Sequence, residues 1–175
     1  MKLFIGCSSS NDIDYKYRDD CEELLSMVLK DNDLVVSADN TGIMGLAQRV
    51  AKENQREVIG ICHSLYLSDI SKVDCDKKIV VDTVFDRTDQ LLHYSDAILF
   101  LPGGIGTVFE IMAVIEKKRS LELDKKIIIY NSFHYFDSML DMLDKIFLEH
   151  FSSNEVKEMY VVANNYEEVL EALSI

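Results

Sequence analysis

The sequence predicts one α/β domain built on a mostly parallel, doubly wound sheet of seven strands. Short apolar runs that lack strict polar alternation are typical of strands covered on both faces, and they alternate here with longer stretches of helical periodicity. Parallel strands need crossover connections, so this alternation predicts helices on both faces of the sheet. The chain has 175 residues, of which 48% are hydrophobic, enough for one core. We therefore expect residues 1–175 to form a single Rossmann-like domain.

Seven apolar runs define the expected strands. In chain order they cover residues 3–5, 34–36, 58–61, 79–81, 97–101, 127–130 and 160–162. Four stretches follow the i, i+3, i+4, i+7 rhythm of an amphipathic helix, and two less regular stretches complete the set. The regular helices cover residues 17–28, 108–115, 136–147 and 166–173, and the other two cover 42–54 and 85–94. Residues 63–77 are expected to form a surface loop or lid between the third and fourth strands.

The composition narrows the classes of partner. The 18 Lys and Arg residues against 31 Asp and Glu residues give a net charge of −13, and such a surface repels nucleic-acid backbones and anionic membranes. The four cysteines lack CxxC spacing and the four histidines lack HxH or HExxH spacing, so we expect no bound metal. No apolar run reaches the roughly 18 residues of a membrane span, and no secretion signal opens the chain, so a cytoplasmic location is expected.

The strongest functional signal is a glycine cluster that follows the fifth apolar run. Pro102 ends that strand, the glycines let the backbone turn tightly and approach an anion, and Thr107 offers a hydroxyl. The helix that follows adds its dipole and the free N–H groups of its first turn. The predicted phosphate site is the backbone of Gly103, Gly104, Ile105, Gly106 and Thr107.

This loop differs from the common cofactor and kinase motifs. It lacks the lysine of GxxxxGK[ST], and it does not follow GxGxxG. Neither kinase chemistry nor hydride transfer with a nicotinamide is therefore supported, and we expect no cofactor.

Glu110 lies one helical turn beyond the loop. It follows Thr107 by three positions and Gly106 by four, so on a helix it shares their face rather than the apolar face of Ile111. Its carboxylate is expected to project beside the molecule that the loop holds. The alternative is a solvated glutamate that only complements the helix dipole.

Loops after the other strands complete the expected site, because ligands of an open α/β sheet gather beyond the carboxyl ends of its strands. Ser8 lies in a loop of small residues after the first apolar run, and Asp39 and Met44 follow the second. We expect these three residues to line the ligand site, where the Asp39 carboxylate can accept hydrogen bonds from hydroxyl or amine groups.

Taken together, these motifs resemble the LONELY GUY family of cytokinin riboside 5′-monophosphate phosphoribohydrolases, whose members were often labelled lysine decarboxylases. The family's PGGxGTxxE motif is complete from Pro102 to Glu110, and Arg87 precedes Pro102 by the 15 residues that separate the family's RK arginine from that proline. The chain also has counterparts of the family's SDA, GSS and GLMG segments. These are residues 95–97, 6–9 and 42–45, and the resemblance extends from residue 3 to about residue 150.

Several positions depart from the family pattern. Residues 37–39 replace the family's GGG, Thr88 replaces the lysine of the RK motif, Phe109 replaces the first glutamate of TLEE, and Lys117 replaces a tryptophan. These changes lie where specificity for base and sugar would be set. The resemblance therefore supports hydrolysis better than it supports a cytokinin substrate.

The resemblance implies that the chain hydrolyses the N-glycosidic bond of a nucleoside 5′-monophosphate to a free base and ribose 5-phosphate. It assigns catalysis to Arg87 and Glu110. It also assigns Ser8, Asp39 and Met44 to the sugar or base, where Asp39 could accept hydrogen bonds from ribose hydroxyls or from an exocyclic amine. Glu110 would stabilise positive charge on the sugar and orient water, and Arg87 would pair with the phosphate or keep Glu110 ionised. For Arg87 the alternative is a surface ion pair with Asp86 or Asp89.

Two other functions stay open: a non-catalytic nucleotide sensor or carrier, and transfer of the sugar to another base. A homodimer is implied by the resemblance alone. The decarboxylase label is not supported, because that chemistry needs a Schiff-base lysine beside a phosphate cradle, and no lysine lies in such a loop.

Overall fold

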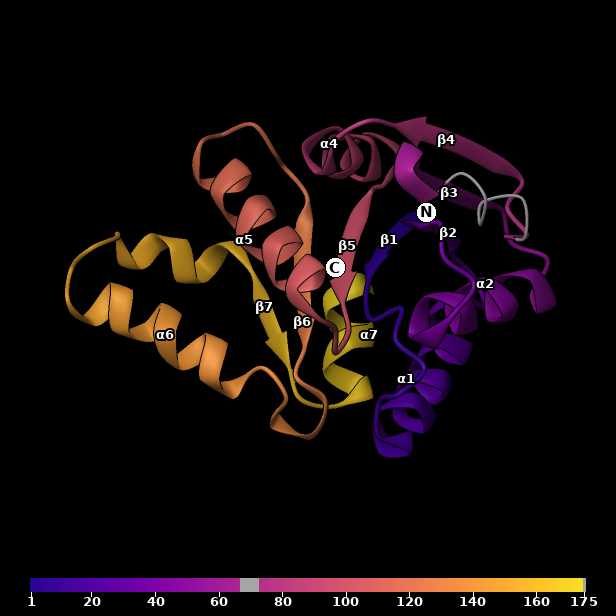
Figure 1. Cartoon of the computed structure of the whole chain (residues 1–175). Helices are drawn as coiled ribbons and strands as arrows, with labels where there is room; N and C mark the ends of the chain where they lie inside the picture. The colour runs from indigo at the N-terminus through magenta and orange to yellow at the C-terminus, as the bar shows by residue number, and fades with distance from the viewer. Residues whose placement is uncertain (67–72, 175) are drawn as a thin grey trace.

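The computed structural model describes residues 1–66 and 73–174, and it has seven parallel strands between two layers of helices (Figure 1). The strand order is β4-β3-β2-β1-β5-β6-β7, and each neighbouring pair is parallel. The strands are β1 Lys2–Gly6, β2 Asp33–Ser37, β3 Val58–His63, β4 Lys77–Val81, β5 Ala97–Phe100, β6 Lys126–Tyr130 and β7 Val161–Ala163. The chain winds outward from β1 in one direction and then restarts at β5 on its other side, so the switch point lies between β1 and β5.

Helices cover both faces of the sheet, and each layer encloses its own hydrophobic core. Neighbouring residues of a strand point to opposite faces, so Leu3 and Ile5 join the core beneath α1, α2 and α7, while Phe4 joins the core beneath α4, α5 and α6. The helices are α1 Tyr15–Val28, α2 Gly42–Glu53, α4 Val84–Tyr94, α5 Ile105–Arg119, α6 Asp137–Leu148 and α7 Tyr166–Ser174. Short 3₁₀ helices follow β3, β6 and α6, and they are η1 Ser64–Tyr66, η2 Ser132–His134 and η3 Asn154–Met159.

The predicted doubly wound α/β fold is confirmed, with each expected strand and helix present. The boundaries move by a few residues: β3 continues to His63, and Leu101 and Tyr160 lie just outside their strands. The expected loop at 63–77 begins with the end of β3 and with η1, and its central residues 67–72 lie outside the described residues. Within the described ranges, no helix is both long and apolar enough to cross a membrane.

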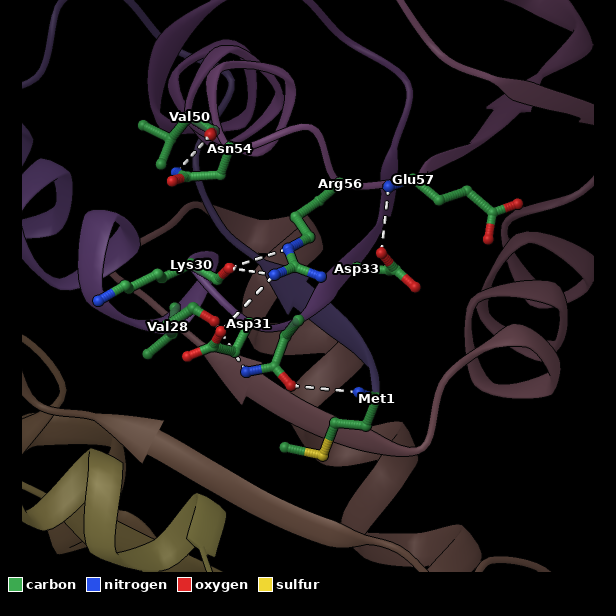
Figure 2. Close-up of polar contacts among 10 residues, drawn as sticks. Met1, Val28, Lys30, Asp31, Asp33, Val50, Asn54, Arg56 and Glu57 are labelled. Atoms are coloured by element: carbon green, nitrogen blue, oxygen red, sulfur yellow. Dashed lines mark hydrogen bonds and ion pairs between the residues drawn. The ribbon is translucent and has the colours of Figure 1, made fainter.

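The amino end of the sheet is closed by hydrogen bonds within the chain (Figure 2). Arg56 donates from Nε and Nη2 to the Lys30 carbonyl at 2.9 and 2.5 Å, and its Nη2 lies 3.6 Å from Asp31. At the start of β2, the Asp33 carboxylate accepts the backbone N–H of Glu57 at 3.1 Å. The polar groups at the amino end of the sheet therefore join the ends of α1 and α2 to the strands.

Candidate functional site

Three loops converge at the carboxyl ends of β1, β2 and β5. The Ser8 N–H donates to the Pro102 carbonyl at 3.2 Å, and the Ser8 carbonyl accepts the N–H of Met44 at 3.1 Å. Gly42, with φ of 57°, lies so close to this loop that an added Cβ would be 2.8 Å from the Ser8 carbonyl oxygen. The first loop thus links the glycine loop to the start of α2, and it brings together Ser8, Met44 and the predicted phosphate site.

The glycine loop is folded tightly at its first glycine and is open beyond it. A Cβ on Gly103 would lie 2.1 Å from Thr107 Oγ1, whereas a Cβ on Gly104 would have no neighbour within 4 Å. Gly104 is the N-cap of α5 and has no side chain with which to accept the N–H groups of the first turn. Gly104, Ile105 and Gly106 are exposed, and Thr107 is buried against the loop. An anion can therefore approach the amino end of α5 directly.

Glu110 lies in the protein interior. Its side chain is 3% exposed, and it shares the buried side of α5 with Ile111 and Val114. Gly6 leaves the space for it, because a Cβ at Gly6 would lie 3.2 Å from Glu110 Oε2 and 2.5 Å from the Phe100 ring. Thr107 lies on the same buried side, as expected, but so does Ile111, so the expectation that Glu110 avoids the apolar face is wrong, and so is its alternative, a solvated glutamate.

Arg87 accompanies Glu110 from the first turn of α4. Its Nη2 lies 3.6 Å from Glu110 Oε1, and its side chain is 19% exposed. The carboxylates of the surface alternative have other partners: Asp86 forms the N-terminal cap of α4 with Thr83, and Asp89 pairs with Lys117 at 3.0 Å. A surface ion pair of Arg87 with either aspartate is therefore wrong.

The guanidinium of Arg87 has a donor that forms no hydrogen bond among the described residues. Its Nε is buried and has no hydrogen-bond partner among the described residues. Its Nη2 also lies 4.0 Å from the position that a Cβ on Gly106 would take, so the guanidinium borders the first turn of α5. A buried donor without a partner costs free energy, so this one needs an explanation.

The carboxyl of Glu110 titrates close to neutral pH. Burial raises the pKa of Glu110 from its ordinary value to about 7, and the positive charge of Arg87 lowers it only in part. Arg87 therefore acts in the direction expected of it, but it does not keep this carboxyl fully ionised. A group with this pKa can carry either charge state under physiological conditions.

A cavity of about 640 Å³ opens beside this pair, over the ends of β2 and β3. Its lining includes Asp39, Met44, His63, Tyr66 and Arg87. Oδ1 of Asp39 accepts the N–H of Thr41 at 3.0 Å and its hydroxyl at 2.7 Å, which fixes the carboxylate at the wall of the cavity.

Two residues of the cavity wall, His63 and Tyr66, were not predicted from the sequence, and their rings form an edge-to-face pair with centroids 6.2 Å apart. The available signal was the position of His63 at the end of an apolar run, the same rule that selected Ser8 and Asp39.

Comparison with known proteins places the chain in a family. A family model described as "Possible lysine decarboxylase" matches residues 44–173. A probable cytokinin riboside 5′-monophosphate phosphoribohydrolase of Oryza sativa subsp. japonica is 30% identical over 174 residues, which cover 98% of this chain and 70% of the relative. The chain belongs to the family of that model and of that phosphoribohydrolase. The resemblance that the PGGxGTxxE motif indicated is confirmed.

A second relative in the family is the cytokinin riboside 5′-monophosphate phosphoribohydrolase of Arabidopsis thaliana that is 29% identical over 98% of this chain and 82% of its own length. Solved structures share the family's fold at lower identity. The molybdenum cofactor carrier protein of Chlamydomonas reinhardtii has a TM-score of 0.72 at 16% identity, over 99% of this chain and 95% of its own. The molybdenum cofactor binding protein of Rippkaea orientalis has a TM-score of 0.72 at 18% identity, over 99% of this chain and 94% of its own.

At the level of the family, the phosphoribohydrolase relatives support a glycosidase-type enzyme. Among the described residues, Arg87 brings a permanent positive charge to the cavity. Within residues 1–66 and 73–174, no three His, Cys, Asp or Glu side chains are placed to hold a metal ion.

Proposed function

We propose that this chain hydrolyses the N-glycosidic bond of a nucleoside 5′-monophosphate, releasing the free base and ribose 5-phosphate, and that it is not a lysine decarboxylase. The observation that carries the proposal is the buried pair of Glu110 and Arg87 beside the open amino end of α5. A carboxylate held within reach of a phosphate site suits a substrate in which sugar and phosphate are joined. The phosphoribohydrolase names of the relatives agree with it.

In this proposal the phosphate binds the N–H groups from Gly103 to Thr107, where the helix dipole favours negative charge. Arg87, which lines the adjoining cavity, supplies a second contact through its guanidinium. The surface carries a net charge of −13, so the anion must be held by such local donors. The base then extends toward the cavity over β2 and β3, where Asp39 and Met44 line the wall and Ser8 supports them from the first loop.

The reaction builds positive charge on C1′ as the bond to the base nitrogen breaks and its electron pair moves to the base. The ionised Glu110 stabilises that charge and accepts a proton from the attacking water, whose oxygen forms the new bond to C1′. The proton passes to the departing base, so Glu110 returns to its starting state. The low exposure of Glu110 strengthens its interaction with the developing charge because little water screens it.

The test is incubation of the purified protein with a panel of nucleoside 5′-monophosphates, with ribose 5-phosphate and free base measured together. Equal release of both products from at least one nucleotide is expected, without added metal or cofactor. Binding without release would favour a nucleotide carrier or sensor. Exchange of one base for another without ribose 5-phosphate would favour transferase chemistry.

The family resemblance also leads us to propose a cytoplasmic homodimer that binds neither nucleic acid nor membranes. Exposed apolar side chains beside the site agree with a dimer: Phe85 is 68% exposed and Ile105 88% exposed. The molar mass in solution, measured by light scattering, tests this part of the proposal. A monomer at micromolar concentration would contradict it.

A further inference from the structure

We propose that Tyr135 is a positioning residue for the phosphate site, and that its hydroxyl fixes the direction of the peptide between Gly103 and Gly104. The proposal rests on the phosphate site described above and adds to it a residue from another part of the chain. Tyr135 follows η2, after β6, and its hydroxyl donates to the Gly103 carbonyl at 2.7 Å.

The hydrogen bond acts on the loop through peptide geometry. A trans peptide is planar, and its C=O and N–H point in opposite directions. When the Gly103 carbonyl is held toward Tyr135, the Gly104 N–H must point to the opposite side of the loop. On its other flank Gly103 packs against Thr107, where a Cβ would lie 2.1 Å from Oγ1. The loop is thus held between a hydroxyl and a side chain, although glycines alone would leave it free to turn.

The backbone that carries Tyr135 has an unusual conformation. Phe133 and His134 have φ of 48° and 60°, in the left-handed region that non-glycine residues rarely occupy. Such a conformation persists only where the surrounding structure enforces it, and it is found most often at functional positions.

Asn131 supplies that enforcement. It is 4% exposed, its Oδ1 accepts the Phe136 N–H at 2.8 Å, and its Nδ2 donates to Asp137 at 2.8 Å. The turn that results directs Tyr135 onto the glycine loop.

Aromatic contacts hold the ring of Tyr135 from two sides. It lies edge-to-face with Tyr17 of α1, with centroids 5.4 Å apart, and with Phe136 at 5.0 Å. These contacts do not involve the hydroxyl, so replacing Tyr135 with phenylalanine removes the hydrogen bond and keeps the packing. The effect of the hydroxyl on the glycine loop can therefore be measured separately from folding.

The experiment compares Tyr135→Phe with Tyr166→Phe. Tyr166 donates its hydroxyl to Asp20 at 2.8 Å, so the control also loses a tyrosine hydrogen bond, but one that joins α7 to α1 and does not contact the glycine loop. Binding of inorganic phosphate is measured by calorimetry, and KM and kcat are measured on the best nucleotide found. For Tyr135→Phe we expect the Kd of phosphate and the KM to rise about fivefold or more, with kcat within twofold of the wild type. Tyr166→Phe should leave these values unchanged.

The outcomes separate this proposal from the proposed hydrolysis. A phosphate Kd within twofold of the wild type in Tyr135→Phe, or an equal weakening in Tyr166→Phe, would overturn the positioning role. Failure of the wild type to bind phosphate would overturn it together with the phosphate site. Phosphate binding that depends on Tyr135, with no ribose 5-phosphate released, would support the positioning role and contradict hydrolysis alone.

Discussion

The two ends of the same sheet use their charged residues differently, and Arg56 and Arg87 illustrate the difference. At the amino end, Arg56 gives two hydrogen bonds to one carbonyl and approaches Asp31 (Figure 2). At the carboxyl end, Arg87 approaches Glu110 only to 3.6 Å, and its buried Nε has no partner among the described residues. Unsatisfied buried donors are uncommon in folded proteins, so this one distinguishes Arg87 from Arg56, whose Nε is paired.

The largest expected effect is on turnover. Glu110→Gln keeps the size and hydrogen-bonding capacity of the side chain but removes the charge that stabilises the transition state, so kcat should fall at least about a hundredfold with little change in nucleotide affinity. The control is Glu116→Gln on the same helix, where the exposed glutamate pairs with Arg119 at 2.5 Å. It should leave kcat within twofold. Near-equal turnover of Glu110→Gln and the wild type would contradict the catalytic role of Glu110 and favour the carrier function.

The second prediction concerns stability against pH. Because burial raises the pKa of Glu110 to about 7 in the folded chain, the folded state holds this proton more tightly than the unfolded state, where the pKa is about 4.3. Its stabilising contribution is present in full below about pH 4.3 and is lost as the pH rises through about 7. Glu110→Gln stays neutral, so it should match the wild type near pH 4 and exceed its free energy of unfolding by about 3 kcal/mol at pH 8. Urea unfolding at both pH values measures this, and an equal difference at the two would contradict it.

The sequence predicted the fold well because strands and helices depend on local periodicity. The family resemblance also offered Glu110 as one of two partners of Arg87, the other being the phosphate. The sequence did not predict the burial of Glu110, because the space for that carboxyl comes from Gly6 on β1, a distant segment that the helix period does not include. It missed Tyr135 for a similar reason. Positive φ values at Phe133 and His134 leave no mark in the residue types, and the bond to Gly103 exists only in the folded chain.

The third prediction compares the two arginines directly. Arg87→Ala removes the cation beside the phosphate site, so the KM for the nucleotide should rise about tenfold or more. Arg56→Ala removes two hydrogen bonds at the other end of the sheet, so it should lower the free energy of unfolding by about 1 kcal/mol and leave KM unchanged. Unfolding and steady-state kinetics on both variants measure this. A rise in KM for Arg56→Ala, or an unchanged KM for Arg87→Ala, would contradict the contrast between the two ends.

The smallest expected effect separates the two ends of β2. Asp33, at its start, accepts the Glu57 N–H, whereas Asp39, just past its end, lies in the wall of the cavity. Among the described residues, the hydrogen bonds of the Asp39 side chain both fall on Oδ1, so Oδ2 is available to a ribose hydroxyl or to an exocyclic amine. Asp39→Ala should therefore change the ratio of kcat/KM between an amino-substituted and an oxo-substituted purine nucleotide by about threefold to tenfold, since one lost hydrogen bond has about that effect. Asp33→Ala should change the free energy of unfolding and leave this ratio as it is. An unaltered ratio in Asp39→Ala would show that the cavity wall reads the base through other residues, and His63 would then be the next to replace.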